Sequence, residues 1–131
     1  MRLFDDGRRL AEENRFAAAL ELFRRVEALN PDFPLIYVNQ AVMLKELGER
    51  EKALELARKQ EGVRPRDPRV EYNVACLLAL NGRHDESLRK LEMAIADGFA
   101  GCQTLETDAD WDALRAHDGF QRVKRTVCQA N

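Results

Sequence analysis

The stretch that decides the fold is Pro34–Gly48, PLIYVNQAVMLKELG, which returns 34 residues later as Pro68–Gly82, PRVEYNVACLLALNG. Both stretches begin with proline, end with glycine and carry apolar residues at the spacing of one helix face. Proline is tolerated at a helix start because its missing N–H would have no partner there, and glycine is favoured just past the end, where the backbone turns left-handed. Each stretch therefore predicts one helix closed by a glycine break.

The same period of 34 runs through most of the chain. Small residues repeat in two columns, leucines repeat in two others, and two prolines repeat as well. The columns are Gly7, Ala41 and Ala75; Leu10, Leu44 and Leu78; Ala19, Ala53 and Ser87; Leu20, Leu54 and Leu88; Pro31 with Pro65; and Pro34 with Pro68. Small residues let two helix axes approach closely, and large residues fill the space beside the crossing. The period predicts repeated helix pairs.

Each repeat is predicted to hold two helices separated by a break. In the second and third repeats the predicted helices span residues 34–47, 51–63, 68–81 and 85–96, the last with Asp85 as its N-cap. Gly48 and Gly82 form two of the breaks. In the first repeat Asn14 stands at the break, because asparagine tolerates the left-handed conformation.

This arrangement resembles the tetratricopeptide repeat family over roughly residues 1–99. The family pattern places aromatic, leucine, glycine, alanine and proline residues at set positions. The matching residues are Tyr37, Ala41, Leu44, Gly48, Ala53 and Pro65 in the second repeat, and Ala75, Leu78, Gly82, Leu88, Leu91 and Ala94 in the third. Asp6 and Gln40 depart from the pattern where the family prefers leucine, and Ala57 and Gln60 replace larger or more apolar residues.

The resemblance implies an all-α fold, a right-handed α-α superhelical solenoid of three helix pairs followed by a C-terminal capping helical segment. The repeats would span residues 1–33, 34–67 and 68–99, and the cap residues 100–131. A solenoid needs such an end piece because its last repeat would otherwise leave an apolar side in water.

The closing segment loses the period from Gly98 onward. Residues 107–110, TDAD, predict a helix start, and four apolar anchors follow at helix-like intervals, Trp111, Leu114, Phe120 and Val123. The segment resembles the C-terminal ending of many bacterial tetratricopeptide proteins. The matching residues are Tyr72, Asn73, Ala75, Cys76, Gly98, Phe99, Asp108, Asp110, Asp112, Leu114, Arg115, Phe120 and Gln121. We expect Trp111 to be buried under the cap, the alternative being a partner-docking hot spot.

In tetratricopeptide arrays, one face of each repeat's first helix lines a concave groove, so the resemblance implies a peptide-binding surface there. The predicted contact residues are Phe4, Arg8, Leu35, Val38, Asn39, Val42, Arg69, Tyr72 and Asn73. Several are bulky and apolar, although the leucine and alanine columns already supply the core. An apolar stripe left over after the core is filled indicates a binding surface. The alternative is that the C-terminal tail or a neighbouring molecule covers it.

Asn39 and Asn73 occupy one column, with Asp5 one period earlier. An amide carries a donor and an acceptor, so it can bind both polar groups of an extended backbone. Related repeat proteins that hold extended peptides use asparagines in this way. Two of them making about four hydrogen bonds, at about 1 kcal/mol each, reach only millimolar affinity. Apolar burial would have to supply the rest.

Some family members bind the C-terminal carboxylate of heat-shock chaperones through lysine, asparagine, asparagine, lysine and arginine. The corresponding positions hold Phe4, Arg8, Asn39, Arg69 and Asn73, so only Asn39 matches and the full clamp is absent. The arginines can still bind an acidic side chain or terminus, since a guanidinium binds carboxylate bidentately.

Charge and composition exclude several function classes. The chain has 21 basic and 23 acidic residues, and the densest basic stretch, 64–69, is interrupted by Asp67. Nucleic-acid binding needs a basic face, and a membrane-spanning helix needs about 20 apolar residues in a row. The first seven residues also lack the apolar stretch of a secretory signal. We expect no nucleic-acid or membrane partner and a cytoplasmic location, although a leader could have been removed from a longer gene product.

The cysteines and histidines predict neither a metal site nor catalysis. Cys76, Cys102 and Cys128 are odd in number, whereas a disulfide framework would need an even count and a secreted context. They also lack the paired spacing of zinc ligands, so we interpret them as small apolar residues. His84 stands where an aromatic packs between two helices, and His117 lies near the cap. No phosphate loop or nucleophile motif is present in the sequence. We therefore expect a chain that is not an enzyme and binds no cofactor.

Two hypotheses of function follow from the sequence. The first is a non-catalytic adaptor or scaffold that binds another protein or a peptide segment in the groove, as a monomer or a weak homo-oligomer. The second is a self-assembly or intramolecular structural module of a larger multi-domain regulator.

Overall fold

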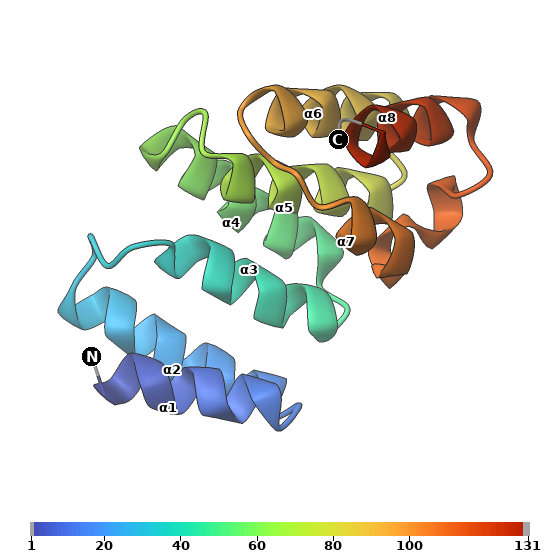
Figure 1. Cartoon of the computed structure of the whole chain (residues 1–131). Coiled ribbons are helices and arrows are strands. Elements are labelled where there is room, and N and C mark those ends of the chain that lie inside the picture. Colours follow the sequence, from blue (N-terminus) through green and yellow to red (C-terminus); the bar gives the residue numbers. More distant parts are fainter. Residues whose placement is uncertain (1, 130–131) are drawn as a thin grey trace. The chain divides into compact units, whose positions relative to one another are not determined.

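The computed structural model describes residues 2–129, and all regular secondary structure in that range is helical (Figure 1). This confirms the all-α prediction. The chain divides into two compact units, residues 1–63 and residues 64–131. Within residues 2–129, no helix combines the length and the apolar character that crossing a bilayer requires.

The first unit consists of two helical hairpins. Its helices are α1 (Arg2–Glu12), α2 (Phe16–Leu29), α3 (Ile36–Glu46) and α4 (Arg50–Val63). Helix α1 packs on α2, α3 packs on α4, and α2 also packs on α3. The small residues of the repeat columns lie where helices cross, since Ala19, Ala41 and Ala53 are all fully buried. Their burial agrees with the close helix approach that the columns predict.

The breaks between paired helices are left-handed, as the sequence predicts. The backbone angle φ is 61° at Asn14, 83° at Gly48 and 77° at Gly82. Glycine and asparagine adopt this conformation at low cost. Leu35 and Arg66 are also left-handed, with φ of 59° and 66°, and no sequence signal predicts either.

Helix α3 starts at Ile36, two residues later than the prediction that places Pro34 at its start. No side chain just before the helix caps it. Instead, the buried Gln60 of α4 accepts hydrogen bonds from the backbone N–H groups of Tyr37 and Val38, at 3.0 and 3.2 Å. These donors have no partner inside the helix. The polar side chain of Gln60 therefore caps the start of a neighbouring helix.

The second unit contains one hairpin and three further helical segments. They are α5 (Pro68–Leu80), α6 (His84–Ala96), α7 (Cys102–Thr107), the 3₁₀ helix η1 (Ala109–Leu114) and α8 (Asp118–Cys128). Pro68 lies in the first turn of α5 as predicted, and the Asp67 carboxylate caps that helix by accepting from the Arg69 N–H at 2.9 Å. The prediction of Asp85 as the N-cap of α6 is wrong, because the helix already begins at His84.

We call α7, η1 and α8 the cap. Its apolar side chains join α5 and α6 in one buried cluster, in which Tyr72, Ile95, Phe99 and Cys102 are partly buried neighbours. The buried members are Ala75, Cys76, Ala79, Leu88, Leu91, Leu105, Trp111, Leu114, Phe120, Val123 and Val127. Trp111 is completely buried. The four apolar anchors predicted from the sequence are therefore core residues, and Trp111 is not a surface docking residue.

The turn between α7 and η1 is held by one arginine. Arg115 donates to the backbone oxygens of Leu105 and Asp108, at 2.9 and 2.6 Å, and to the Asp112 carboxylate at 3.0 Å. Asp108 caps η1 by accepting from the Asp110 N–H at 2.9 Å. The predicted helix start at residues 107–110 is thus confirmed.

Candidate functional site

Helix α3 and Leu35, the residue just before it, carry an amphipathic stripe of partly exposed side chains, Leu35, Asn39 and Val42, which we call the α3 stripe. The spacing of four and three residues places the three on one side of the helix. The Asn39 amide donates to the backbone oxygen of Leu35 at 2.9 Å. This bond uses one N–H and orients the side chain, while the amide oxygen keeps its capacity to accept.

The other predicted contact residues of the first unit differ in their surroundings. Phe4 lies against Phe23 and Phe33, with ring centroids 5.5 and 4.7 Å apart, so it contributes to an aromatic cluster. Val38 is only 9% exposed. Arg8 is exposed, and it makes no ion pair among the residues that the structure describes. The Arg8 guanidinium is therefore accessible to an acidic group of a partner.

The predicted contact residues of the second unit make more hydrogen bonds and ion pairs within the chain than those of the first unit. The Asn73 amide donates to the backbone oxygen of Arg69 at 2.8 Å, which repeats the Asn39 arrangement one period later. The Arg69 guanidinium pairs with Asp67 at 2.9 Å. Hydrogen bonding to Asp67 raises the pKa of Arg69, and the same bond lowers the pKa of the Asp67 carboxyl. Arg69 therefore pairs with the N-cap residue of its own helix, α5.

The cap covers Tyr72, one of the two aromatic residues among the predicted contact residues. Its hydroxyl donates to the Asp108 carboxylate at 2.7 Å and accepts from the Trp111 indole N–H at 3.0 Å. Its ring stacks on Phe99, with centroids 4.4 Å apart. Burial is the main cause that raises the pKa of the Tyr72 hydroxyl. The surface of α5 around Tyr72 is therefore occupied by the chain's own C-terminal segment.

A buried carboxyl group lies next to this region. Glu71 of α5 is 1% exposed, and neither of its carboxylate oxygens has a hydrogen-bond partner within residues 2–129. Burial, and then the neighbouring Asp97 carboxylate, raise the pKa of Glu71 to about 7. Asp97 accepts from Arg66 at 2.8 Å, and this contact lowers the pKa of Asp97. A protonated Glu71 can donate to Asp97, which explains the preference for the neutral form.

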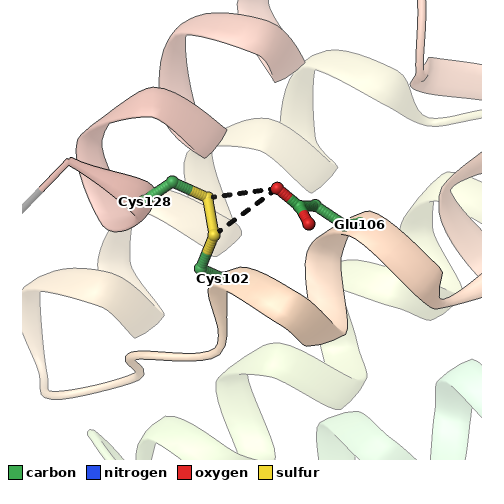
Figure 2. A group of neighbouring side chains, drawn as sticks. All are labelled: Cys102, Glu106 and Cys128. Atoms are coloured by element: carbon green, nitrogen blue, oxygen red, sulfur yellow. Dashed lines mark hydrogen bonds between the residues drawn. A yellow bond between two sulfur atoms is a disulfide. The ribbon is translucent and has the colours of Figure 1, made fainter.

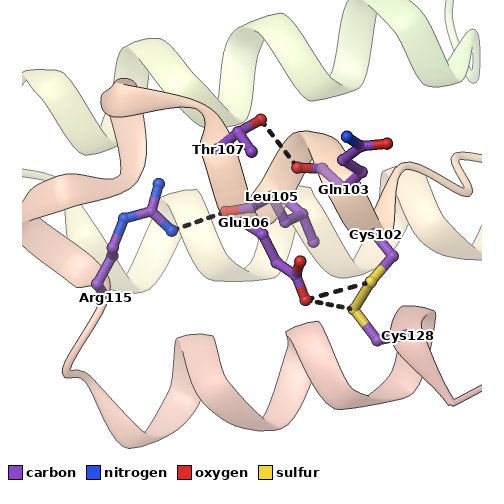
Figure 3. Close-up of a disulfide and its surroundings, with 7 residues drawn as sticks. All are labelled: Cys102, Gln103, Leu105, Glu106, Thr107, Arg115 and Cys128. Carbon is purple, nitrogen blue, oxygen red and sulfur yellow. Dashed lines mark hydrogen bonds between the residues drawn. A yellow bond between two sulfur atoms is a disulfide. The ribbon is translucent and has the colours of Figure 1, made fainter.

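The structure contradicts the prediction that all three cysteines are merely small apolar residues. Cys102 and Cys128 form a disulfide (Figures 2 and 3). Cys76 is buried in the core cluster. Cys102 opens α7 and Cys128 ends α8, and these two helices pack on each other. Sequence spacing gave no signal because the pair is 26 residues apart and meets only after the cap folds.

Glu106 lies one turn after Cys102 on α7, facing the disulfide (Figure 2). Its Oε1 is 3.7 Å from the Cys102 sulfur and 3.9 Å from the Cys128 sulfur. Thiolates and carboxylates are zinc ligands, but sulfurs bonded to each other are not thiolates. A second group, Cys76, Asp108 and Asp110, converges in the same way, although Asp108 already binds Tyr72 and the Asp110 N–H.

The two histidines have structural positions. His84 is the half-buried first residue of α6, and His117 caps α8 by accepting from the Gly119 N–H at 3.0 Å. Neither histidine shares a hydrogen bond with a nucleophilic side chain among the described residues. The His117 cap was not predicted from the sequence.

The geometry defines a class: an all-α protein of helical hairpins, with one amphipathic stripe on α3 and an internal cap over α5. No protein-family model matches the chain, and no similar protein was found among curated proteins.

Proposed function

We propose that the chain is a non-catalytic protein-binding module of the tetratricopeptide type, acting as an adaptor or scaffold. In this proposal its three helix pairs stack as a right-handed superhelical solenoid, and a peptide or protein segment binds along the first helices of the pairs. The 34-residue period and the helical hairpins that carry it support this choice.

The observation that carries the proposal is the α3 stripe. It presents two aliphatic side chains, Leu35 and Val42, on either side of an amide whose orientation is set by its own helix. This combination suits an extended backbone that pairs with Asn39 while apolar side chains pack beside it. Hydrogen bonds to one amide contribute about 2 kcal/mol. Most of the affinity must then come from apolar burial, at about 25 cal/mol per Å².

The cap narrows the binding surface. Since Tyr72 is engaged by Asp108, Trp111 and Phe99, we assign recognition chiefly to the first unit, with Asn39 at its centre and Arg8 as an accessible cation. An acidic side chain or a terminal carboxylate on the partner suits Arg8.

Affinity capture from native lysate, followed by mass spectrometry, tests the proposal. The bait is the whole chain, and the test variant carries Asn39→Ala together with Asn73→Ala. Both side chains bond only their own helix carbonyls, so helicity should be retained. We expect specific partners to be depleted at least tenfold, and Lys52→Ala on α4 provides an exposed control. Equal capture by the wild type and the double variant would count against recognition through these amides.

Exposed apolar residues favour self-assembly as the second candidate. Leu29 and Val63 end α2 and α4, occupy the same place in the repeat, and are 70% and 63% exposed. Light scattering over a range of concentrations tests this candidate. Assembly through these residues predicts a mass that rises with concentration and returns to that of a monomer in the double variant Leu29→Glu and Val63→Glu.

Two features of the chain point to different cellular compartments. The sequence favours the cytoplasm, whereas the Cys102–Cys128 disulfide favours an oxidising compartment, where such bonds persist. Thiol blocking at the moment of cell lysis, followed by mass spectrometry, distinguishes the two. Blocked cysteines at both positions would support the cytoplasm, and an intact disulfide would support an oxidising compartment.

A further inference from the structure

We propose that Cys102 and Cys128 are a reversible thiol–disulfide site that locks the cap, and that Glu106 slows its reaction with anionic thiols. The site is separate from the proposed binding stripe on α3 and does not depend on the proposed function. Its substrates are thiol and dithiol reductants in one direction and disulfide oxidants in the other.

The two cysteines stand at opposite ends of the cap in the sequence. Cys102 is the first residue of α7 and Cys128 is the last residue of α8, so the bond joins the two ends of the cap. The cap side chains that enter the core cluster lie between them in sequence: Leu105, Trp111, Leu114, Phe120, Val123 and Val127. A bond at these ends therefore closes the whole capping segment into one ring.

The two cysteines of the disulfide differ from Cys76 in their exposure to solvent. Cys102 and Cys128 are partly exposed, and both lie at helix ends. Cys76 is 3% exposed and lies inside the core cluster. A reductant can thus reach the disulfide while the unit stays folded, and Cys76 provides a buried thiol in the same chain for comparison.

The Glu106 carboxylate lies 3.7 and 3.9 Å from the Cys102 and Cys128 sulfurs (Figure 2). A disulfide has no S–H, so the carboxylate gains no hydrogen bond from the oxidised pair. In the reduced pair, a thiol can donate to this oxygen, and the negative charge disfavours the thiolate. The same charge repels an incoming thiolate, which is the species that attacks a disulfide. Glu106 therefore slows exchange in both directions.

A dithiol reductant supplies both electrons needed to reduce the Cys102–Cys128 disulfide. Its thiolate attacks one sulfur, a new S–S bond forms, and the Cys102–Cys128 bond breaks as the other cysteine leaves with the electron pair and takes a proton from water. The second thiolate of the reductant then displaces the attached cysteine. Two electrons and two protons reach the protein, and the reductant becomes a cyclic disulfide. Reoxidation by a disulfide oxidant reverses these steps.

Reduction should loosen the ends of the cap and leave its middle in place. Helix α7 has only six residues, and apart from the disulfide it is held by the buried Leu105 and by the bond from Arg115 to the Leu105 backbone (Figure 3). Segment η1 is held by Trp111 and by the bonds of Tyr72. Opening would thus begin at α7 and at the last turn of α8.

The experiment uses the whole chain, purified under non-reducing conditions. Intact mass should be 2 Da below that of the fully reduced chain. Native alkylation should label neither Cys102 nor Cys128 before reduction and both afterwards, with Cys76 protected throughout. Hydrogen exchange should accelerate in α7 and the end of α8 after reduction and in Cys102→Ser, with little change in η1. Free thiols at both positions in the non-reduced protein, or identical exchange in both states, would overturn the lock.

The role of Glu106 is tested by the charge of the reductant. Rate constants per thiolate are compared for 3-mercaptopropionate, which is anionic, and cysteamine, whose ammonium offsets the thiolate. In the wild type the Glu106 charge should favour cysteamine over 3-mercaptopropionate by about fivefold, as expected for about 1 kcal/mol of repulsion near 4 Å in water, in addition to the intrinsic difference in nucleophilicity between the two thiolates. Glu106→Gln should lower the ratio of the cysteamine rate to the 3-mercaptopropionate rate by about fivefold, because the intrinsic difference between the reagents is the same in both proteins. Glu55→Gln on α4 should leave the ratio at its wild-type value. An unchanged ratio in Glu106→Gln would exclude the electrostatic role.

Discussion

Tyr72 and Asp108 are 36 residues apart in the sequence, and their hydroxyl and carboxylate oxygens lie 2.7 Å apart in the folded second unit. The same hydroxyl accepts from the buried Trp111 indole at 3.0 Å. The Tyr72 hydroxyl of α5 therefore makes one hydrogen bond to each of two cap residues, Asp108 and Trp111. The cap is thus attached by directional bonds as well as by apolar packing.

Tyr72→Phe should destabilise the second unit by about 1–3 kcal/mol, because it leaves the Trp111 N–H buried without a partner. Urea unfolding followed by far-UV circular dichroism and by tryptophan fluorescence measures the loss. Tyr37→Phe is the matched control, since the Tyr37 hydroxyl makes no hydrogen bond among the described residues. A loss of stability in Tyr72→Phe no larger than that of the control would show that the hydrogen bonds of the Tyr72 hydroxyl do not stabilise the cap.

Glu71→Gln should change how stability depends on pH. The pKa of Glu71 is about 7 in the folded chain against an ordinary 4.5, so the folded state binds this proton more tightly than the unfolded state. Its favourable contribution is fully present below pH 4.5 and is lost as the pH rises through about 7. The loss amounts to about 3 kcal/mol at most. Glu71→Gln should therefore stabilise the chain at pH 8 and have little effect at pH 4.5.

The measurement for Glu71 is a series of urea titrations between pH 4.5 and 8.5. Exposed Glu55→Gln controls for the loss of one negative charge. Asp67 and Asp97 have lowered pKa values, so their contributions are present at neutral pH and are lost on acidification. Parallel curves for the wild type and Glu71→Gln would contradict the raised pKa.

Two glycines in helices should respond oppositely to alanine. A Cβ at Gly7 would lie 2.7 Å from the ring of the buried Phe23, whereas a Cβ at Gly62 would meet nothing within 4 Å. Alanine gains about 1 kcal/mol of helix propensity over glycine, and overpacking costs about 1–3 kcal/mol. We expect Gly7→Ala to be destabilising by about 1 kcal/mol and Gly62→Ala to be stabilising by a similar amount, measured by thermal and urea unfolding. Stabilisation by both changes would contradict the tight contact at Gly7.

Removing the disulfide should cost about 3 kcal/mol under oxidising conditions, because the bond restricts a loop of 26 residues in the unfolded chain. Cys102→Ser and Cys128→Ser should lose this amount equally, and dithiothreitol should lower the wild type to the same level. Dithiothreitol should have no effect on either variant. Cys76→Ser tests the buried thiol separately, and its loss should not depend on the reductant.

The repeated hairpins could be predicted from the sequence because each depends on short-range signals. Helix periodicity, left-handed breaks at Asn14, Gly48 and Gly82, and small residues at crossings all act within or between adjacent helices. The sequence shows a polar residue at position 60 but does not reveal its role. The hydrogen-bond partners of Gln60 are backbone N–H groups 22 and 23 residues away.

The cap and its chemistry could be predicted only in part. Apolar spacing indicated that Trp111 and Phe120 are anchors, and both are fully buried. The Cys102–Cys128 disulfide and the burial of Glu71 depend on how non-repeating segments fold back, for which the 34-residue period holds no information. Glu71 stands one period after Tyr37, and a charged residue in an aromatic's place was the available signal.

Site-specific photo-crosslinking tests the proposed binding function most directly. A benzophenone amino acid at Val42, in the α3 stripe, is compared with the same group at exposed Glu55 on α4, in cells that contain the natural partners. The proposal predicts a discrete crosslinked partner from position 42 that is lost with Asn39→Ala and absent from position 55. Crosslinks of equal pattern at both positions, or none from position 42, would contradict recognition through α3.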